Sequence, residues 1–409
     1  MSAVDVLPTR WAGRVRDPRL PRWLIGGGLV ALALVGLVFA FHGRGGDMRV
    51  YLTAAGRFAE GSALYRENDA DFPFKYLPPA VLLFFPLSFL PVRLAMALWN
   101  LGSVGLMAWL VVRTRCFVED VGGLVTTPAG ARDWAPVVAL LAVVLPVHRV
   151  LMLGQVDVLI VALTFGASVW PERERRGWDV AAAAAGTLAA LMKPPAALVG
   201  LVWLSGRRWR VIGWCLPAML VLWAPILGRY GWDATLELVA AWLAVLEKTT
   251  LPRLLEHNTQ GLPTLLLLGF EHPSEVPTAR AMWMGQLAAL AAFLLLIIVR
   301  RPRRWELVML VCFATAFLSP LAWRANFVAA YPLVYASLVT PDVPVRRGAW
   351  ALAALLVLNG LVVSADLLGW ERERRVLYFM RPYAVLYGVL LLWVTVGARL
   401  TMRQRSVQV

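Results

Sequence analysis

Long apolar stretches separated by short polar segments run along this chain from residue 23 to residue 398. A helix needs about 20 residues to cross a bilayer, and most of these stretches approach that length. The pattern therefore predicts an all-α polytopic membrane protein. The thirteen candidate segments are residues 23–41, 77–91, 93–113, 135–151, 156–170, 178–192, 194–206, 211–228, 279–299, 306–322, 327–340, 349–366 and 383–399.

The basic clusters predict how many of these segments cross. Arginines gather in "RRWR" (207–210) and "RRPRR" (300–304), between apolar stretches. Such clusters mark cytoplasmic loops. If they and both termini are cytoplasmic, one of the six candidates between residues 42 and 206 does not cross. "LPPAVLLFFPLSFLP" (77–91) is bracketed and interrupted by prolines, so a broken or re-entrant piece is expected in this half. We predict about twelve crossings.

No fixed-period repeat or low-complexity linker divides the chain, so we predict one integral-membrane domain. Its two longest loops lie outside on this topology, and both contain helix-like apolar patterns. The predicted organisation is a basic cytoplasmic N-terminus (1–22), the membrane domain (23–399) with external loops at about 42–76 and 229–278, and a cytoplasmic tail (400–409).

Composition supports a membrane protein and argues against a nucleic-acid surface, a disulfide framework and a zinc site. Of the 409 residues 60% are hydrophobic and 16% charged, and the mean hydropathy is +0.67. The net charge of +15 sits in short clusters, which favours membrane orientation over a nucleic-acid surface. The three cysteines show no CxxC spacing, so neither a disulfide framework nor a zinc site is indicated.

The first external loop contains "GGDMRVYLTAAG" (45–56), which predicts a short amphipathic helix on the membrane surface with Gly61 as its terminator. Asp47 opens this helix. One interpretation is helix N-capping, which Asp does well. The other is a general base at the water–lipid boundary, where a partly desolvated carboxylate takes a proton from a hydroxyl. The two are compatible.

Polar residues recur at other ends of apolar stretches. Lys75 and Tyr76 in "FKYLPP" are a snorkelling and interfacial pair or part of a phosphate site. Gln155 and Asp157 in "GQVDV", and Lys193 in "LMKPP", stand between apolar stretches. A charge inside the bilayer costs about 2.5–3.5 kcal/mol, so such residues face a water-filled cavity or pair with one another.

The second long loop ends in "EHNTQG", which places His257, Asn258 and Gln260 together before an apolar segment. Such a cluster fits a ligand headgroup, and a solvated loop end is the alternative.

"LSPLAWRANF" (318–327) predicts a tight outer turn that contains Arg324 and Asn326. An arginine fork suits a phosphate or diphosphate, and an interfacial arginine neutralised by lipid phosphate is the alternative.

Two function classes fit an outward-facing polar pocket. A secondary transporter has about twelve spans and broken helices, but usually shows two internal repeats and a site near the midplane. Here the two halves look unlike each other. The asymmetry favours an enzyme that acts on a membrane lipid.

Six segments taken together carry a family resemblance. They are "GGDMRVYLTAAG", "FKYLPPAVLLFFPLSFLP", "GQVDVLIVAL", "LMKPPAALVGL", "HNTQGL" and "LSPLAWRANFVAAYPLV". Their order and spacing, from about residue 40 to 340, resemble the polyprenyl-phosphate-sugar-dependent glycosyltransferases of family 87. These belong to the multi-span GT-C class and include mannosyl- and arabinosyltransferases.

The resemblance implies a GT-C-like fold and an inverting transfer of a sugar, by default mannose, with arabinose as the alternative. Asp47 would be the catalytic base. The donor phosphate would be bound by Lys75, Lys193 and Arg324. Sugar or acceptor hydroxyls would be bound by Tyr51, Tyr76, Gln155, Asp157, His257, Asn258, Gln260 and Asn326.

It also implies partners and a location. The donor is a polyprenyl-phosphate sugar, the acceptor a lipid or glycan, and the surroundings are membrane lipids; no nucleic acid is expected. No cofactor or nucleotide sugar is expected, and no nucleotide fingerprint or metal cage is evident, although one carboxylate and a phosphate could hold a divalent ion weakly. The expected place is a bacterial plasma membrane, with the site on the periplasmic or extracellular side.

The chain departs from the family pattern at two places. Relatives often carry histidines after the "SPxxW" element, where this chain has Arg324 and Asn326. Proton handling then falls to Asp47 alone or with His257, or this member has changed substrate or lost activity. Asp157 stands where an Asn is more usual.

Overall fold

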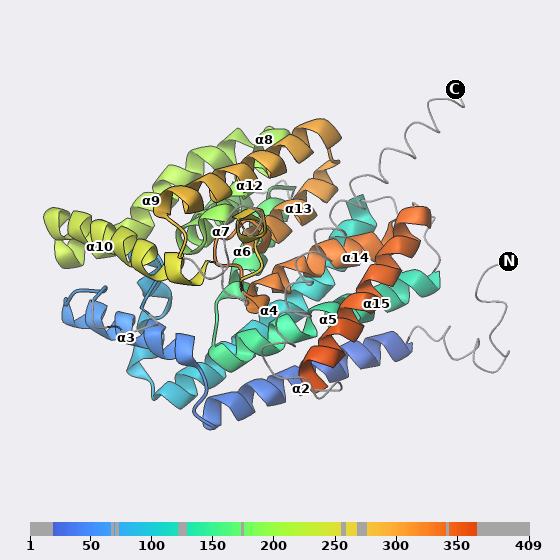
Figure 1. Cartoon of the computed structure of the whole chain (residues 1–409), viewed down its shortest axis with the longest axis horizontal. Helices are drawn as coiled ribbons and strands as arrows, with labels where there is room; N and C mark the ends of the chain where they lie inside the picture. The colour runs from blue at the N-terminus through green and yellow to red at the C-terminus, as the bar shows by residue number, and fades with distance from the viewer. Residues whose placement is uncertain are drawn as a thin grey trace.

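The computed structural model describes residues 19–66, 69, 73–121, 129–172, 176–254, 259–267, 276–340 and 343–365. His257, Asn258, the candidate segment 383–399 and the predicted tail 400–409 lie outside them. All regular elements of the described part are helices (Figure 1).

The longer helices are α2 (Arg19–Phe41), α4 (Val92–Val121), α5 (Ala129–Leu153), α9 (Trp209–Tyr230), α10 (Trp232–Thr250), α12 (Ala279–Arg300) and α15 (Val343–Ala365). The shorter α-helices are α3 (Gly46–Glu60), α6 (Asp157–Val169), α7 (Arg176–Met192), α8 (Val199–Ser205), α11 (Leu262–Leu267), α13 (Arg304–Phe317) and α14 (Tyr331–Val339). The 3-10 helices are η1 (Pro78–Leu83), η2 (Phe85–Phe89), η4 (Trp170–Glu172), η5 (Pro194–Leu198), η6 (Leu251–Arg253) and η7 (Arg324–Ala330).

Five helices of the described part are long and apolar enough to cross a membrane, namely α2, α4, α5, α9 and α12. Each coincides with a predicted segment, and the chain is an all-α membrane protein. The count of about twelve crossings and the GT-C-like arrangement are not confirmed and stay predictions. Residues 77–91 form η1 and η2 instead of one long helix, as expected of a proline-interrupted segment.

The core lies between two groups of helices. In Figure 1 α2 and α5 run along the bottom of the molecule, and α8, α9 and α12 lie at the top. Between these groups, nearly all of α13 from Trp305 to Phe317 is buried, and so is all of α14. A helix that is apolar on all sides is stable only when it is enclosed. These two helices therefore form the centre against which α5 and η7 pack.

Helix α3 confirms the amphipathic helix predicted for residues 45–56. It ends at Gly61, whose φ of 71° is the left-handed conformation that glycine adopts readily. Its apolar residues are not left for lipid. Met48, Tyr51, Leu52, Ala54, Ala55 and Phe58 are buried in a cluster with residues of η1, α4 and the segment before η1. Protein therefore covers the apolar face of this helix, and its predicted position on the membrane surface stays a prediction.

The N-capping interpretation of Asp47 is also wrong. Gly45 is the N-cap, and no side chain makes a capping hydrogen bond. Asp47 lies in the first turn of α3, where its carboxylate is directed to a partner on another element.

Candidate functional site

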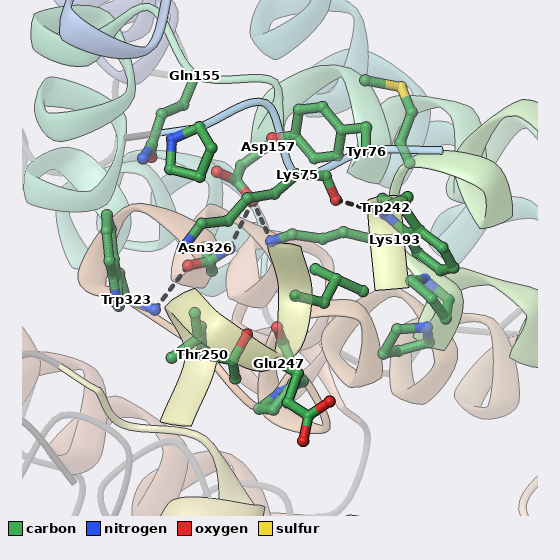
Figure 2. Close-up of a pocket in the computed structure, with 18 of the residues that line it drawn as sticks. Lys75, Tyr76, Gln155, Asp157, Lys193, Trp242, Glu247, Thr250, Trp323 and Asn326 are labelled. Atoms are coloured by element: carbon green, nitrogen blue, oxygen red, sulfur yellow. Dashed lines mark hydrogen bonds and ion pairs between the residues drawn. The ribbon is translucent and has the colours of Figure 1, made fainter. Parts of the chain in front are cut away.

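A cavity of about 550 Å³ collects most of the polar residues that the sequence indicated (Figure 2). Its walls come from α3, the segment before η1, the turn between α5 and α6, the junction of α7 with η5, and the turn before η7. Helices α10 and α12 complete it. The predicted residues that line it are Asp47, Tyr51, Lys75, Tyr76, Gln155, Asp157, Lys193 and Asn326.

The turn after α5 brings Gln155 to Asp47. Gly154 has a φ of 72°, and a Cβ there would lie 2.7 Å from the Cβ of Met48 on α3. Only glycine permits this turn and this close approach of the two helices. Gln155 Nε2 then donates a hydrogen bond of 2.6 Å to Asp47 Oδ2, and the Gln155 carbonyl accepts one from Trp99 Nε1.

Asp47 is half-buried, and its burial raises the pKa of the carboxyl to about 6. Removal from water disfavours the charged form. The hydrogen bond from Gln155 opposes this rise, the nearby Asp157 charge adds to it, and the charges of Arg149 and Lys75 oppose it. Asp47 is therefore ionised at neutral pH and is a stronger base than an exposed aspartate.

A second carboxylate, Asp157, begins α6 and is held by two donors. Lys193 Nζ lies 2.5 Å and Asn326 Nδ2 2.8 Å from its Oδ1. Asn326 in turn accepts a hydrogen bond of 2.7 Å from the backbone N–H of Trp323. Figure 2 shows Lys193 and Asn326 converging on Asp157 from two other parts of the chain. A charge pair with additional hydrogen bonds is the arrangement in which a buried ion is tolerated.

The proline pair after Lys193 places that side chain. Helix α7 ends at Met192, and Pro194 and Pro195 begin η5, so Lys193 has an extended backbone between the two. This confirms that the helix stops at the lysine. Its ammonium group faces Asp157 and the cavity instead of lipid.

Lys75 and Tyr76 form the wall next to α3. The Lys75 carbonyl accepts a hydrogen bond of 3.0 Å from Trp242 Nε1 on α10, which ties that helix to this segment. The Tyr76 hydroxyl lies 3.1 Å from that of Tyr51, and its carbonyl accepts one of 2.6 Å from Tyr65. Burial raises the pKa of both paired phenols, so they remain hydrogen-bonding hydroxyls.

Two predicted residues are placed elsewhere. Arg324 begins η7 and interacts electrostatically with His148, and it is not among the residues that line the cavity. Gln260 is fully buried, and its backbone N–H donates to the Ala322 carbonyl. Neither observation tests the predicted binding roles, and those of His257 and Asn258 fall outside the described residues.

The sequence interpretation missed the wall formed by α10 and α12. Trp242, Leu243, Leu246, Glu247 and Thr250 face the cavity from α10, at the three- and four-residue spacing of a single helix face. That spacing was visible in the predicted external loop, but nothing in the sequence showed what the face would meet. Trp323, on the other side, also lines the cavity.

Within the part of the chain that the structure describes, no three His, Cys, Asp or Glu side chains gather as a metal site. The prediction that the reaction needs no resident metal stays a prediction.

Comparison with known families connects this cavity to an activity. Residues 74–322 match the family model of glycosyltransferase family 87. Comparison with curated proteins and with solved structures gives no match. The matched segment includes Lys75, Gln155, Asp157 and Lys193, whereas Asp47 precedes it. Since the match covers more than half of the chain, this protein is a membrane glycosyltransferase that belongs to glycosyltransferase family 87.

Proposed function

We propose that this enzyme transfers a sugar, mannose by default, from a polyprenyl-phosphate donor to a hydroxyl of a lipid or glycan at the outer face of the membrane, with inversion at the anomeric carbon. The observation that carries the proposal is the cavity itself. It holds a carboxylate whose pKa lies near 6 beside two lysines, and an apolar wall faces them. The family favours this chemistry over the transport of a solute.

Asp47 would act as the general base. The acceptor O–H gives its proton to the Asp47 carboxylate, and the acceptor oxygen bonds to the anomeric carbon. The bond from that carbon to the phosphate oxygen breaks, and its electron pair leaves on the prenyl phosphate. A base whose pKa is close to the working pH is efficient in such a step.

Lys75 and Lys193 would stabilise the departing phosphate. Negative charge grows on that group as the glycosidic bond breaks, and cations that are already in place lower the barrier. Lys193 is held by Asp157, so its position is fixed before the donor arrives. Gln155, Asp157, Asn326 and the two tyrosines supply donors and acceptors for sugar or acceptor hydroxyls.

The test is transfer from radiolabelled polyprenyl-phosphate mannose into membrane lipids by the purified protein in nanodiscs. Asp47→Asn should lower the rate by about 10²–10⁴-fold, the usual contribution of a general base. The amide oxygen of the substituted side chain would still accept the hydrogen bond from Gln155, so the fold should be retained. Asp233→Asn, in the first turn of α10 and exposed, is the matched control and should leave the rate unchanged.

Transfer by Asp47→Asn at the wild-type rate would remove Asp47 as the base. If the wild type transfers no mannose, the donor panel extends to polyprenyl-phosphate arabinose and to added glycan acceptors. Transfer from none of these donors would contradict the proposed function.

A further inference from the structure

We propose that the cavity wall formed by α10 and α12 binds the hydrocarbon chain of the lipid donor, and that the chain leaves the cavity along the exposed apolar face of α12. This inference rests on the proposed function, because it places the tail of the donor whose headgroup reacts near Asp47. It assigns a binding site for a prenyl chain to named residues.

The cavity has two unlike sides. Asp47, Gln155, Asp157, Lys193 and Asn326 occupy one side and are joined in hydrogen-bonded networks. The other side is mainly apolar: Trp242, Leu243 and Leu246 come from α10, Met282 and Trp283 from α12, and Leu321 from the turn before η7, while Glu247, Thr250 and Gln286 are its polar members. A ligand that fills both sides therefore has a polar head and an apolar tail.

Helix α12 connects this wall to the membrane. It is a 22-residue helix that is apolar enough to cross a bilayer, and Trp283 lies in its first turns. The cavity therefore touches a candidate span near the end of that span.

An exposed apolar track continues from the cavity along α12. Trp283 is 58% exposed, although it lines the cavity. Leu287, Leu294 and Ile298 follow on the same side at helical spacing; Leu287 and Ile298 are more exposed than Trp283, and Leu294 is half-buried. A flexible prenyl chain needs such a continuous apolar strip, whereas a sugar or a polar acceptor would gain nothing from it.

Helix α10 supplies the rest of the apolar wall. Leu243 is 51% exposed and lines the cavity, and Trp242 on the same face is fixed by its hydrogen bond to the Lys75 carbonyl. The apolar wall is therefore attached directly to the segment that carries Lys75. The contact between Trp242 and Lys75 would place the donor phosphate beside the lysines and the prenyl chain along the apolar wall.

The experiment measures chain-length selectivity with prenyl monophosphates that carry no sugar. Binding of a long-chain and a two-isoprene prenyl monophosphate to the purified full-length protein in detergent is followed by thermal stabilisation. The wild type should prefer the long chain by roughly tenfold in Kd. The wall variant Leu243→Ala/Trp283→Ala should lose most of this preference while its affinity for the short-chain phosphate stays within about twofold of the wild type.

The matched control is Trp214→Ala/Leu220→Ala on α9, which removes the same two residue types from the exposed surface of another candidate span. Neither residue lines the cavity. The control should keep the wild-type preference. A change that only weakened the fold would lower binding of both probes together and leave the ratio unchanged.

Three results would overturn the inference: a wild type without chain-length preference, a wall variant with the wild-type ratio, or a control whose ratio falls as far as that of the wall variant. Because the probes carry no sugar, this outcome is independent of the transfer assay. Long-chain selectivity that depends on the wall, together with no transfer from any sugar donor, would contradict the proposed function while the lipid site stands.

Discussion

The two sides of the cavity are built in opposite ways. The polar side takes its residues from α3, the α5–α6 turn, the α7–η5 junction and the turn before η7, and joins them by hydrogen bonds between residues as far apart as Asp157 and Asn326. The apolar side takes nearly all of its residues from single faces of α10 and α12. One side depends on tertiary contacts and the other on helical periodicity.

Because of this difference, the two sides should respond differently to amino-acid substitutions. Removing one member of the polar network leaves a charge or an amide without its partner, and that loss extends to other elements. Truncating one apolar wall residue removes only contact area. Substitutions on the polar side that leave a buried group without its partner should therefore affect folding or the pH dependence, whereas those on the wall should affect only the choice of lipid.

The largest effect on stability is expected at the buried ion pair. Lys193→Met leaves Asp157, which is 7% exposed, with Asn326 as its remaining donor. An ion that loses its partner in such a place destabilises a protein by about 3 kcal/mol. Thermal unfolding in detergent should show a marked decrease in midpoint, partly restored by the second change Asp157→Leu. Lys248→Met, which removes an exposed lysine, is the control. An equal midpoint for the two single variants would show that the pair does not hold these elements together.

A smaller effect is expected on the pH profile. Asp47 must be ionised to act as a base, so kcat/KM should fall below a pH of about 6, by about tenfold per unit. Gln155 donates to the ionised carboxylate and holds its pKa down. Gln155→Leu should therefore raise that pKa further and move the acidic limb to higher pH. A limb that stays in place, or moves to lower pH, would show that another group controls this ionisation.

The smallest effect is expected at Arg324, which does not line the cavity, and Lys75 provides the comparison. Lys75→Met should raise the KM for the donor about tenfold, since it removes a cation from the cavity wall. Arg324→Met should raise it by less than about threefold. Steady-state kinetics with the polyprenyl-phosphate donor compare the two. The reverse order would place the phosphate near η7 and support the role that the residue pattern first indicated.

The sequence by itself determined the class of protein and much of the site. Hydrophobic segments of membrane length predict the five helices that the structure confirms, because the length of an apolar helix follows from local composition. The rule that charges near a membrane face a cavity or pair with one another selected Asp157 and Lys193, and the two are partners. The glycine after α3 and the prolines after Lys193 also determined where helices end, since these residues act within one turn.

Only the tertiary structure decided which partner each polar residue has. Asp47 had the pattern of a cap, but the fold directs it to Gln155, 108 residues away, through a turn that Gly154 permits. The apolar residues of α3 had the pattern of a membrane surface, and the structure covers them with η1 and α4. The faces of α10 and α12 were periodic in the sequence, yet only the fold brings both of them to one cavity. Periodicity shows which residues share a face, whereas what that face meets depends on contacts between elements distant in the chain.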